Sequence, residues 1–244
     1  MFRRGTLFGT FLISTLLFNQ ALAGISLNAT RVIFNEKDKE ASLSVTNQGA
    51  QQILLQSWLE TENSDDTVPF AITPPLARMA GNARQQLRIL FQGIGVPTDK
   101  ESVFWINAQE IPQAAPGKNT LQLAVRQRIK LFYRPAGLTG EAIMAPLALN
   151  WKLFREGKAL FVQVDNPSHF HVSLAKVSVH ANGQEARAQD APMVAPGQSA
   201  RIALSPYSAA SSMTLKFTAI NDYGGTNHYK ATLTANQVAQ AQRE

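Results

Sequence analysis

The segment NTLQLAVRQRIKLFYRP, residues Asn119–Pro135, has the pattern of one long β-strand. Its odd-numbered positions from Leu121 to Tyr133 are apolar apart from Gln127, while most of its even-numbered positions carry Gln, Arg or Lys. Strict alternation is typical of a strand with one buried face. Most strands are only about 5–6 residues long, and no Gly or Pro divides this one into a hairpin. We therefore expect a partner to cover its length.

The chain before this segment predicts strands almost throughout. Pro74-Pro75 excludes a central strand at that point, and the sequence does not tell whether either of the two prolyl bonds is cis. Seven short strands separated by turn residues favour an antiparallel sandwich of immunoglobulin-like size. The six strands that precede the long one are predicted at residues 25–34, 41–46, 52–60, 70–73, 84–92 and 102–112.

The second half of the chain repeats this rhythm. Residues 136–141 are small and show no periodicity, so we place a domain boundary there, with one domain at residues 24–140 and another at residues 141–244. The tail from residue 236 is polar and is expected to fray or to form a turn of helix. The predicted fold class is all-β, with two immunoglobulin-like sandwiches in series. The strands of the second are expected at residues 147–155, 159–165, 172–181, 198–205, 213–221 and 228–234.

The N-terminus has the pattern of a secretory signal peptide. Arg3 and Arg4 precede an apolar run at residues 7–18, and the small-residue sequence Ala-Leu-Ala at residues 21–23 is suited to cleavage. The run is shorter than the ~20 residues that span a bilayer. We therefore predict a signal peptide at residues 1–23 and an exported protein.

Composition excludes several classes of function. Without Arg3 and Arg4 the 23 basic residues become 21, which against 17 acidic residues leave a net charge of +4. No block of like charge and no basic patch with interleaved aromatic residues occurs, so neither nucleic acid nor a membrane surface is indicated as a partner. The chain has no cysteine, which excludes disulfides, thiol chemistry and Cys-based metal sites.

Enzymatic motifs are missing from the sequence. His169 and His171 with Asp165 would form at most half a metal site, and we expect them to lie in a solvated turn. No nucleophile elbow, phosphate-binding Gly loop or zincin motif occurs. We predict a protein that is not an enzyme and that uses no metal, cofactor or small-molecule substrate.

Cations on the long segment are the better lead to function. Arg126, Arg128 and Lys130 share one face of it, and three unpaired cations are too costly to bury together. One interpretation is a solvated strand face, and the other is a site for an anion. Arg31 favours the second, because a lone Arg in an otherwise apolar strand needs a carboxylate or phosphate partner.

Four motifs carry a resemblance to a known family. They are TRVIF around Arg31, FWINAQEIP at residues 104–112, RIKLFYRP at residues 128–135 and NDYGG at residues 221–225. Together they resemble the periplasmic chaperones of the chaperone–usher pilus pathway. The four motifs follow one another over the whole mature chain, and the octapeptide around Lys130 is the most specific. Outside NDYGG, the second domain matches the family weakly.

The resemblance implies two immunoglobulin-like domains in a boomerang arrangement and a periplasmic chaperone that binds, folds and caps pilus subunits. It implies that Arg31 and Lys130 bind the C-terminal carboxylate of a subunit. It also implies that Leu121, Leu123 and Val125 fill the groove that a subunit leaves open by lacking its last strand, which is donor-strand complementation. The implied partners are pilus subunits and an outer-membrane usher. Which subunits, which usher and which type of pilus are not specified.

The same resemblance implies an ionic link between the two domains, formed by Glu110, Arg134 and Asp222. Alternation raises a difficulty at Lys130, which falls on the face opposite Val125. A bulge, a twist or a change of partner is needed if both roles hold.

An open apolar edge also makes self-association of the free protein a reasonable hypothesis. Monomeric behaviour in ultracentrifugation at high concentration would contradict it.

Two other classes of function remain alternatives. A secreted two-domain adhesin or carbohydrate-binding module would also be all-β and free of cysteine, but it should present aromatic residues on a face or loop. Trp58, Trp105 and Trp151 lie instead within strand patterns. A periplasmic enzyme lacks support because no acid–base or metal constellation occurs.

Overall fold

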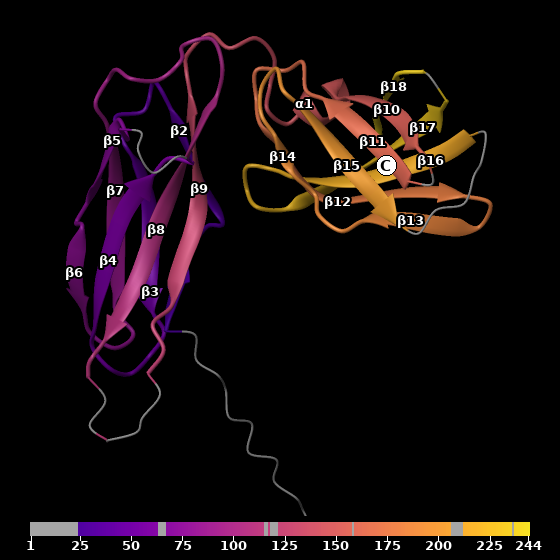
Figure 1. Ribbon diagram of the computed structural model, residues 1–244. Helices are drawn as coiled ribbons and strands as arrows, with labels where there is room; N and C mark the ends of the chain where they lie inside the picture. Colours follow the sequence, from indigo (N-terminus) through magenta and orange to yellow (C-terminus); the bar gives the residue numbers. More distant parts are fainter. Residues whose placement is uncertain are drawn as a thin grey trace, which may run out of the picture.

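A computed structural model of the chain describes residues 24–62, 67–114, 117, 122–157, 159–205, 212–235 and 237–244. These residues form two β-sandwiches set at an angle to each other and joined by residues 135–144 (Figure 1). Each sandwich has a hydrophobic core of its own. The all-β, two-domain prediction is therefore confirmed.

The first sandwich packs two sheets together. One sheet has the strand order β1-β3-β7-β5, and the other has the order β2-β9-β8-β4-β6. Strands β5 and β6 lie at sheet edges on either side of a cis Thr73–Pro74 bond. The strands are β1 (Ile25–Leu27), β2 (Arg31–Asn35), β3 (Ala41–Asn47), β4 (Ile53–Glu60), β5 (Phe70–Thr73), β6 (Leu76–Met79), β7 (Arg84–Phe91), β8 (Ser102–Pro112) and β9 (Arg126–Arg134).

The single strand predicted at residues 25–34 is in fact two strands in different sheets. β1 pairs antiparallel with β3, and after a break at residues 28–30 the chain enters the other sheet, where β2 pairs parallel with β9. This change of sheet carries Arg31 to the side of Lys130.

β9 is shorter than the predicted strand at Asn119–Pro135. Of that segment, residues 119–121 lie outside the described residues and residues 122–125 are not part of a strand. Only the second half of β9 is anchored in the core, where Leu131 and Tyr133 are buried. The Tyr133 ring packs 4.5 Å from Phe91 and 5.7 Å from Phe70, between ring centroids.

The second sandwich has the strand order β18-β10-β11-β15-β13-β12-β16-β17-β19, with β14 paired to β12. β15 joins the two layers by pairing with both β11 and β13. A short helix, α1 (Ala145–Ala148), precedes the strands. These are β10 (Asn150–Glu156), β11 (Ala159–Asp165), β12 (Val172–Ala181), β13 (Gln184–Ala188), β14 (Met193–Val194), β15 (Ser199–Ser205), β16 (Ser212–Ile220), β17 (Thr226–Thr234), β18 (Ala239–Gln240) and β19 (Gln242–Arg243).

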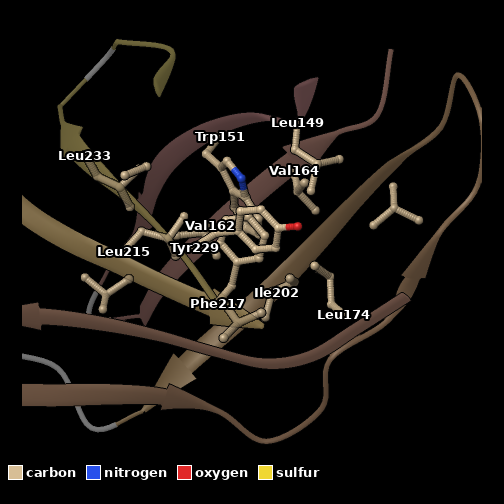
Figure 2. Close-up of a cluster of buried hydrophobic side chains, with 14 of the residues drawn as sticks. Leu149, Trp151, Val162, Val164, Leu174, Ile202, Leu215, Phe217, Tyr229 and Leu233 are labelled. Atoms are coloured by element: carbon tan, nitrogen blue, oxygen red, sulfur yellow. The ribbon is translucent and has the colours of Figure 1, made fainter. Parts of the chain in front are cut away.

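The core of the second sandwich is centred on a buried row of aromatic rings (Figure 2). Trp151 from β10 lies 4.8 Å from Phe217 of β16, and Phe217 lies 5.1 Å from Tyr229 of β17, between ring centroids. The row connects the two layers because β10 belongs to one of them and β16 and β17 to the other. Rings at these spacings add to the stabilisation that burial alone provides.

The sequence predicts a C-terminal tail that frays or forms a turn of helix. In the structure the tail forms two short strands instead. β18 pairs with β10, and β19 pairs with β17. The tail therefore covers both outer edges of the sheet, which would otherwise present unpaired backbone groups.

Arg134 at the end of β9 connects the two sandwiches. Its guanidinium donates two hydrogen bonds of 2.7 Å to the Asp222 carboxylate in the β16–β17 turn, and its Nε donates a third to Glu101 Oε1 at 2.7 Å. Burial acts to lower the pKa of Arg134, but the hydrogen bonds and charges of the two carboxylates outweigh it and raise the pKa. Arg134 is therefore a permanent cation that holds a residue of each domain.

Glu110, predicted as the third member of this link, does not join it. In the β8–β9 hairpin Ser102 pairs with Tyr133, so Glu101 is the residue opposite Arg134. Glu110 is nine residues farther along β8, about 30 Å away at the rise of a strand, where it is buried beside Gly24. The acidic residue that the first domain contributes to the link is Glu101.

The His169–His171 loop forms a second part of the domain contact. The Glu101 side chain is only 1% exposed, and its Oε2 accepts hydrogen bonds from the backbone N–H of His171 at 2.7 Å and from the ring Nδ1 at 2.9 Å. The Glu101 backbone N–H donates to the His169 carbonyl at 2.9 Å. His171 is thus buried between the domains, and the solvated turn predicted here is wrong for this residue.

Replacing Glu101 should loosen the arrangement of the two domains. Glu101→Ala removes a carboxylate that binds both Arg134 and His171, and each hydrogen bond to a charged group contributes about 1.5–3 kcal/mol. We expect small-angle scattering to show a wider spread of interdomain orientations. The matched control is Glu110→Ala, which should leave the orientation unchanged. An unchanged scattering profile for Glu101→Ala would contradict this role.

Candidate functional site

Two cations lie side by side where β2 begins. The parallel pairing of β2 with β9 places Arg31 directly opposite Lys130. Directly paired residues present their side chains on the same face of a sheet. Two like charges in this position repel each other unless an anion binds between them.

Arg31 is held in place by groups that do not neutralise its charge. Its Nη1 donates to the Ile220 carbonyl at 3.2 Å, and its guanidinium carbon lies 5.6 Å from the centroid of the Phe132 ring. Its buried Nε has no hydrogen-bond partner among the described residues. Burial lowers the pKa of Arg31, although the carboxylates of Asp222 and Glu101 act in the opposite direction.

Lys130 is in a similar situation. Its ammonium lies 5.4 Å from the centroid of the Trp105 ring, and no carboxylate of the described residues lies within 4.0 Å of it. Burial lowers the pKa of Lys130 and the charge of Arg31 lowers it further, although the Glu62 carboxylate acts in the opposite direction. A bound carboxylate would favour the charged form of both residues and would accept charge-assisted hydrogen bonds from them.

A cleft of about 500 Å³ opens beside Arg31, between the two sandwiches. Both domains contribute to its lining, which combines charged groups with apolar and aromatic side chains. Lys130 is not part of this lining and lies next to it on β9. Residues that line the cleft include Arg31, Phe132, Arg134, Ile143, Phe170 and Tyr223.

β9 has an open edge on the side where β2 lies. β2 pairs with it only from Lys130 to Arg134. In the part of the chain that the structure describes, no strand continues this pairing along residues 126–129, while β8 covers the opposite edge throughout. The backbone groups on the open edge are therefore available to a strand from another chain.

Leu123 and Val125, predicted to insert into a subunit, precede this open edge and are exposed to 71% and 39%. Leu121 lies outside the described residues. The register of β9 with β8 continues without a bulge, and the Val125 carbonyl still accepts a hydrogen bond of 3.1 Å from the Glu110 backbone N–H.

The sequence predicts that Lys130 and Val125 fall on opposite faces of one strand, and the absence of a bulge leaves them there. By alternation, Val125 shares the face of Leu131, which is buried in the core, while Lys130 shares the outer face with Arg31. No switch of faces is needed. The core-facing side of the segment is simply uncovered before residue 126.

The structure brings together Arg31 with Lys130 and Arg134 with Asp222. The sequence alone did not predict a role for Glu101 or Trp105. The register of the β8–β9 hairpin would have identified both residues. Counting back from Tyr133 opposite Ser102 places Glu101 opposite Arg134 and Trp105 opposite Lys130.

Two other features do not occur among the described residues. No group of three or more His, Cys, Asp or Glu residues there could hold a metal ion. No helix in that part of the chain is long and apolar enough to cross a membrane.

Comparison with known proteins gives a consistent family. Residues 24–139 match the N-terminal domain of the PapD pili and flagellar-assembly chaperones, and residues 144–231 match the C-terminal domain of the PapD pili assembly chaperones. The chaperone protein FimB/FhaD of Bordetella pertussis is 38% identical over 226 residues, covering 87% of this chain and 89% of that protein.

Solved structures agree with this match. The crystal structure of the YadV chaperone has 36% sequence identity and a TM-score of 0.77, covering 86% of this chain and 100% of that one. The Salmonella enterica SafB chaperone, solved in complex with the SafA pilin, has 27% identity and a TM-score of 0.71, covering 90% and 96%. Members of this family are chaperones and not enzymes. The chain therefore belongs to the family of PapD-like pilus assembly chaperones.

Proposed function

We propose that this chain is a periplasmic chaperone that binds pilus subunits along β9, caps them by donor-strand complementation and delivers them to an outer-membrane usher. The observation that carries the proposal is an open strand edge that ends at two adjacent, unneutralised cations, Arg31 and Lys130. Main-chain pairing along the edge gives affinity for any extended strand. The two cations select a strand that ends there in a C-terminal carboxylate.

The direction of the bound strand follows from this geometry. A subunit strand on the open edge lies in line with β2 and ends where β2 begins, at Arg31. If its terminal carboxylate binds Arg31 and Lys130, its chain must run toward Lys130, as β9 does. The added strand is therefore parallel to β9, as β2 is.

The apolar residues before the edge supply most of the affinity in this proposal. Burial of Leu121, Leu123 and Val125 in a subunit would contribute about 1.5–3 kcal/mol each, and each main-chain hydrogen bond about 1 kcal/mol. Association costs about 4–15 kcal/mol, so these terms come close to balance. The two cations then decide whether binding occurs and in which register.

The comparisons support this choice over the alternatives. SafB, a structural relative, forms a complex with a pilin, and no match favours an adhesin or a carbohydrate-binding module. Export to the periplasm rests on the predicted signal peptide at residues 1–23, which lies outside the described residues. Usher delivery rests on the family resemblance.

Removing either cation should weaken subunit binding and leave the fold intact. Arg31→Ala or Lys130→Ala removes a partner of the bound carboxylate, which costs about 2 kcal/mol or more, roughly a 30-fold loss of affinity. Titration calorimetry with a pilus subunit, or co-purification with it, measures the effect. The control is Arg88→Ala, which removes an exposed Arg paired with Glu40 in the other sheet. Subunit recovery equal to wild type would refute the carboxylate site.

Leu123 should matter for binding and not for stability. Leu123→Ser removes an apolar side chain that is 71% exposed in the free protein, so the denaturation midpoint should change little. Loss of its burial in a subunit should weaken binding by about 1.5–3 kcal/mol. Val238→Ser, at a second exposed apolar position, serves as the control. Equal affinity for Leu123→Ser and wild type would exclude Leu123 as a donor residue.

A further inference from the structure

Four residues form a row across the outer face of the first sandwich. Glu60 of β4 pairs with Trp105 of β8, Trp105 pairs with Lys130 of β9, and Lys130 pairs with Arg31 of β2. Directly paired residues present their side chains on the same face. Trp105 therefore stands between a carboxylate on one side and the two cations of the candidate site on the other.

The Trp105 ring contacts two cations. The Lys130 ammonium lies 5.4 Å from its centroid, and the guanidinium carbon of Arg128 lies 3.8 Å from it. Both distances are within the ~6 Å at which an aromatic face attracts a cation. The ring is half-buried, so it also limits the directions in which the flexible lysine chain can extend.

Glu60 is fully engaged by other groups. Its Oε1 accepts a hydrogen bond of 2.7 Å from Trp58 Nε1, and Arg126 Nη2 lies 2.9 Å from both of its oxygens. Arg128 Nε lies 3.4 Å from Oε2. The hydrogen bond from Trp58 is the main cause that lowers the pKa of Glu60, followed by smaller effects from Asn107 and the two arginines.

Without the ring, Lys130 would have a competing partner. The strands β4 and β9 are two strand spacings apart, or about 10 Å, and a lysine and a glutamate side chain extended toward each other can close that distance. A Lys130–Glu60 ion pair would remove one of the two charges beside Arg31. A bulky, uncharged residue at position 105, between Glu60 and Lys130, prevents this ion pair.

We propose that Trp105 is a positioning residue of the carboxylate site: its ring holds the Lys130 ammonium beside Arg31 and keeps it apart from Glu60. The inference rests on the proposed function, because it assigns Trp105 a role in carboxylate recognition. Trp105 does not touch the subunit carboxylate itself and acts only through Lys130.

The test uses a peptide of the C-terminal strand of a pilus subunit, made once with a free carboxylate and once with a terminal amide. The ratio of the two affinities measures carboxylate recognition separately from strand pairing. Trp105→Leu should lower this ratio about fivefold and leave the affinity for the amide unchanged. Trp105→Phe keeps an aromatic ring and should keep most of the ratio.

Trp58→Leu is the matched control, since it removes a ring from the same face that contacts Arg126 and donates to Glu60, while Trp105 still stands between Glu60 and Lys130. Its ratio should equal that of wild type. An equal loss of affinity for both peptides in Trp105→Leu would mean a merely structural role and would overturn the proposal, as would an unchanged ratio. If wild type itself fails to distinguish the peptides, the carboxylate site of the proposed function is wrong as well.

A second measurement does not depend on the folding of a variant. Nuclear magnetic resonance of the wild-type protein should show the Lys130 ε-proton signals displaced by the ring current of Trp105. Lys130 ε-protons at the ordinary position of a solvated lysine would overturn the proposal.

Discussion

The parallel pairing of β2 with β9 is the constraint on which the rest of the structure depends. The pairing spans only Arg31–Asn35 against Lys130–Arg134, because the preceding strand, at residues 25–27, belongs to the other sheet. The short overlap has two consequences at once. It brings Arg31 and Lys130 together, and it leaves the earlier part of β9 with one open edge. The two adjacent cations and the open strand edge therefore arise from a single feature of the topology.

The same strand also connects the site to the second domain. Arg134 is four residues from Lys130 on β9, so the two side chains point to the same face, about 13 Å apart along the strand. Arg134 binds Asp222, while Arg31 donates to the Ile220 carbonyl only two residues away. Gly224 in the same turn (φ +82°) approaches Thr30 so closely that any side chain there would collide with it. The second domain is thus fixed relative to the two cations.

Alternation in the sequence was sufficient to predict the all-β fold and the two faces of β9, while the roles of Arg31 and Lys130 came from the family resemblance and stay predictions. Alternation was not sufficient for Glu101, because the choice between Glu101, just before β8, and Glu110, within it, depends on the register of the β8–β9 hairpin. It also missed the break between β1 and β2, since residues 28–30 contain no Gly or Pro. Which residues pair across two strands depends on the tertiary structure, and the pattern of a single strand does not encode it.

The free protein keeps both cations charged at a cost to its own stability. Burial and the charge of Arg31 lower the pKa of Lys130 in the folded state, so its protonated form is less favourable there than in the unfolded chain. This destabilisation is present in full below the lowered pKa of the folded state, diminishes as the pH rises through that pKa, and is gone above 10.5, the ordinary pKa of a lysine. A carboxylate bound between Arg31 and Lys130 would offset it. Because such a ligand binds only the folded state, it must also stabilise the chaperone that holds it.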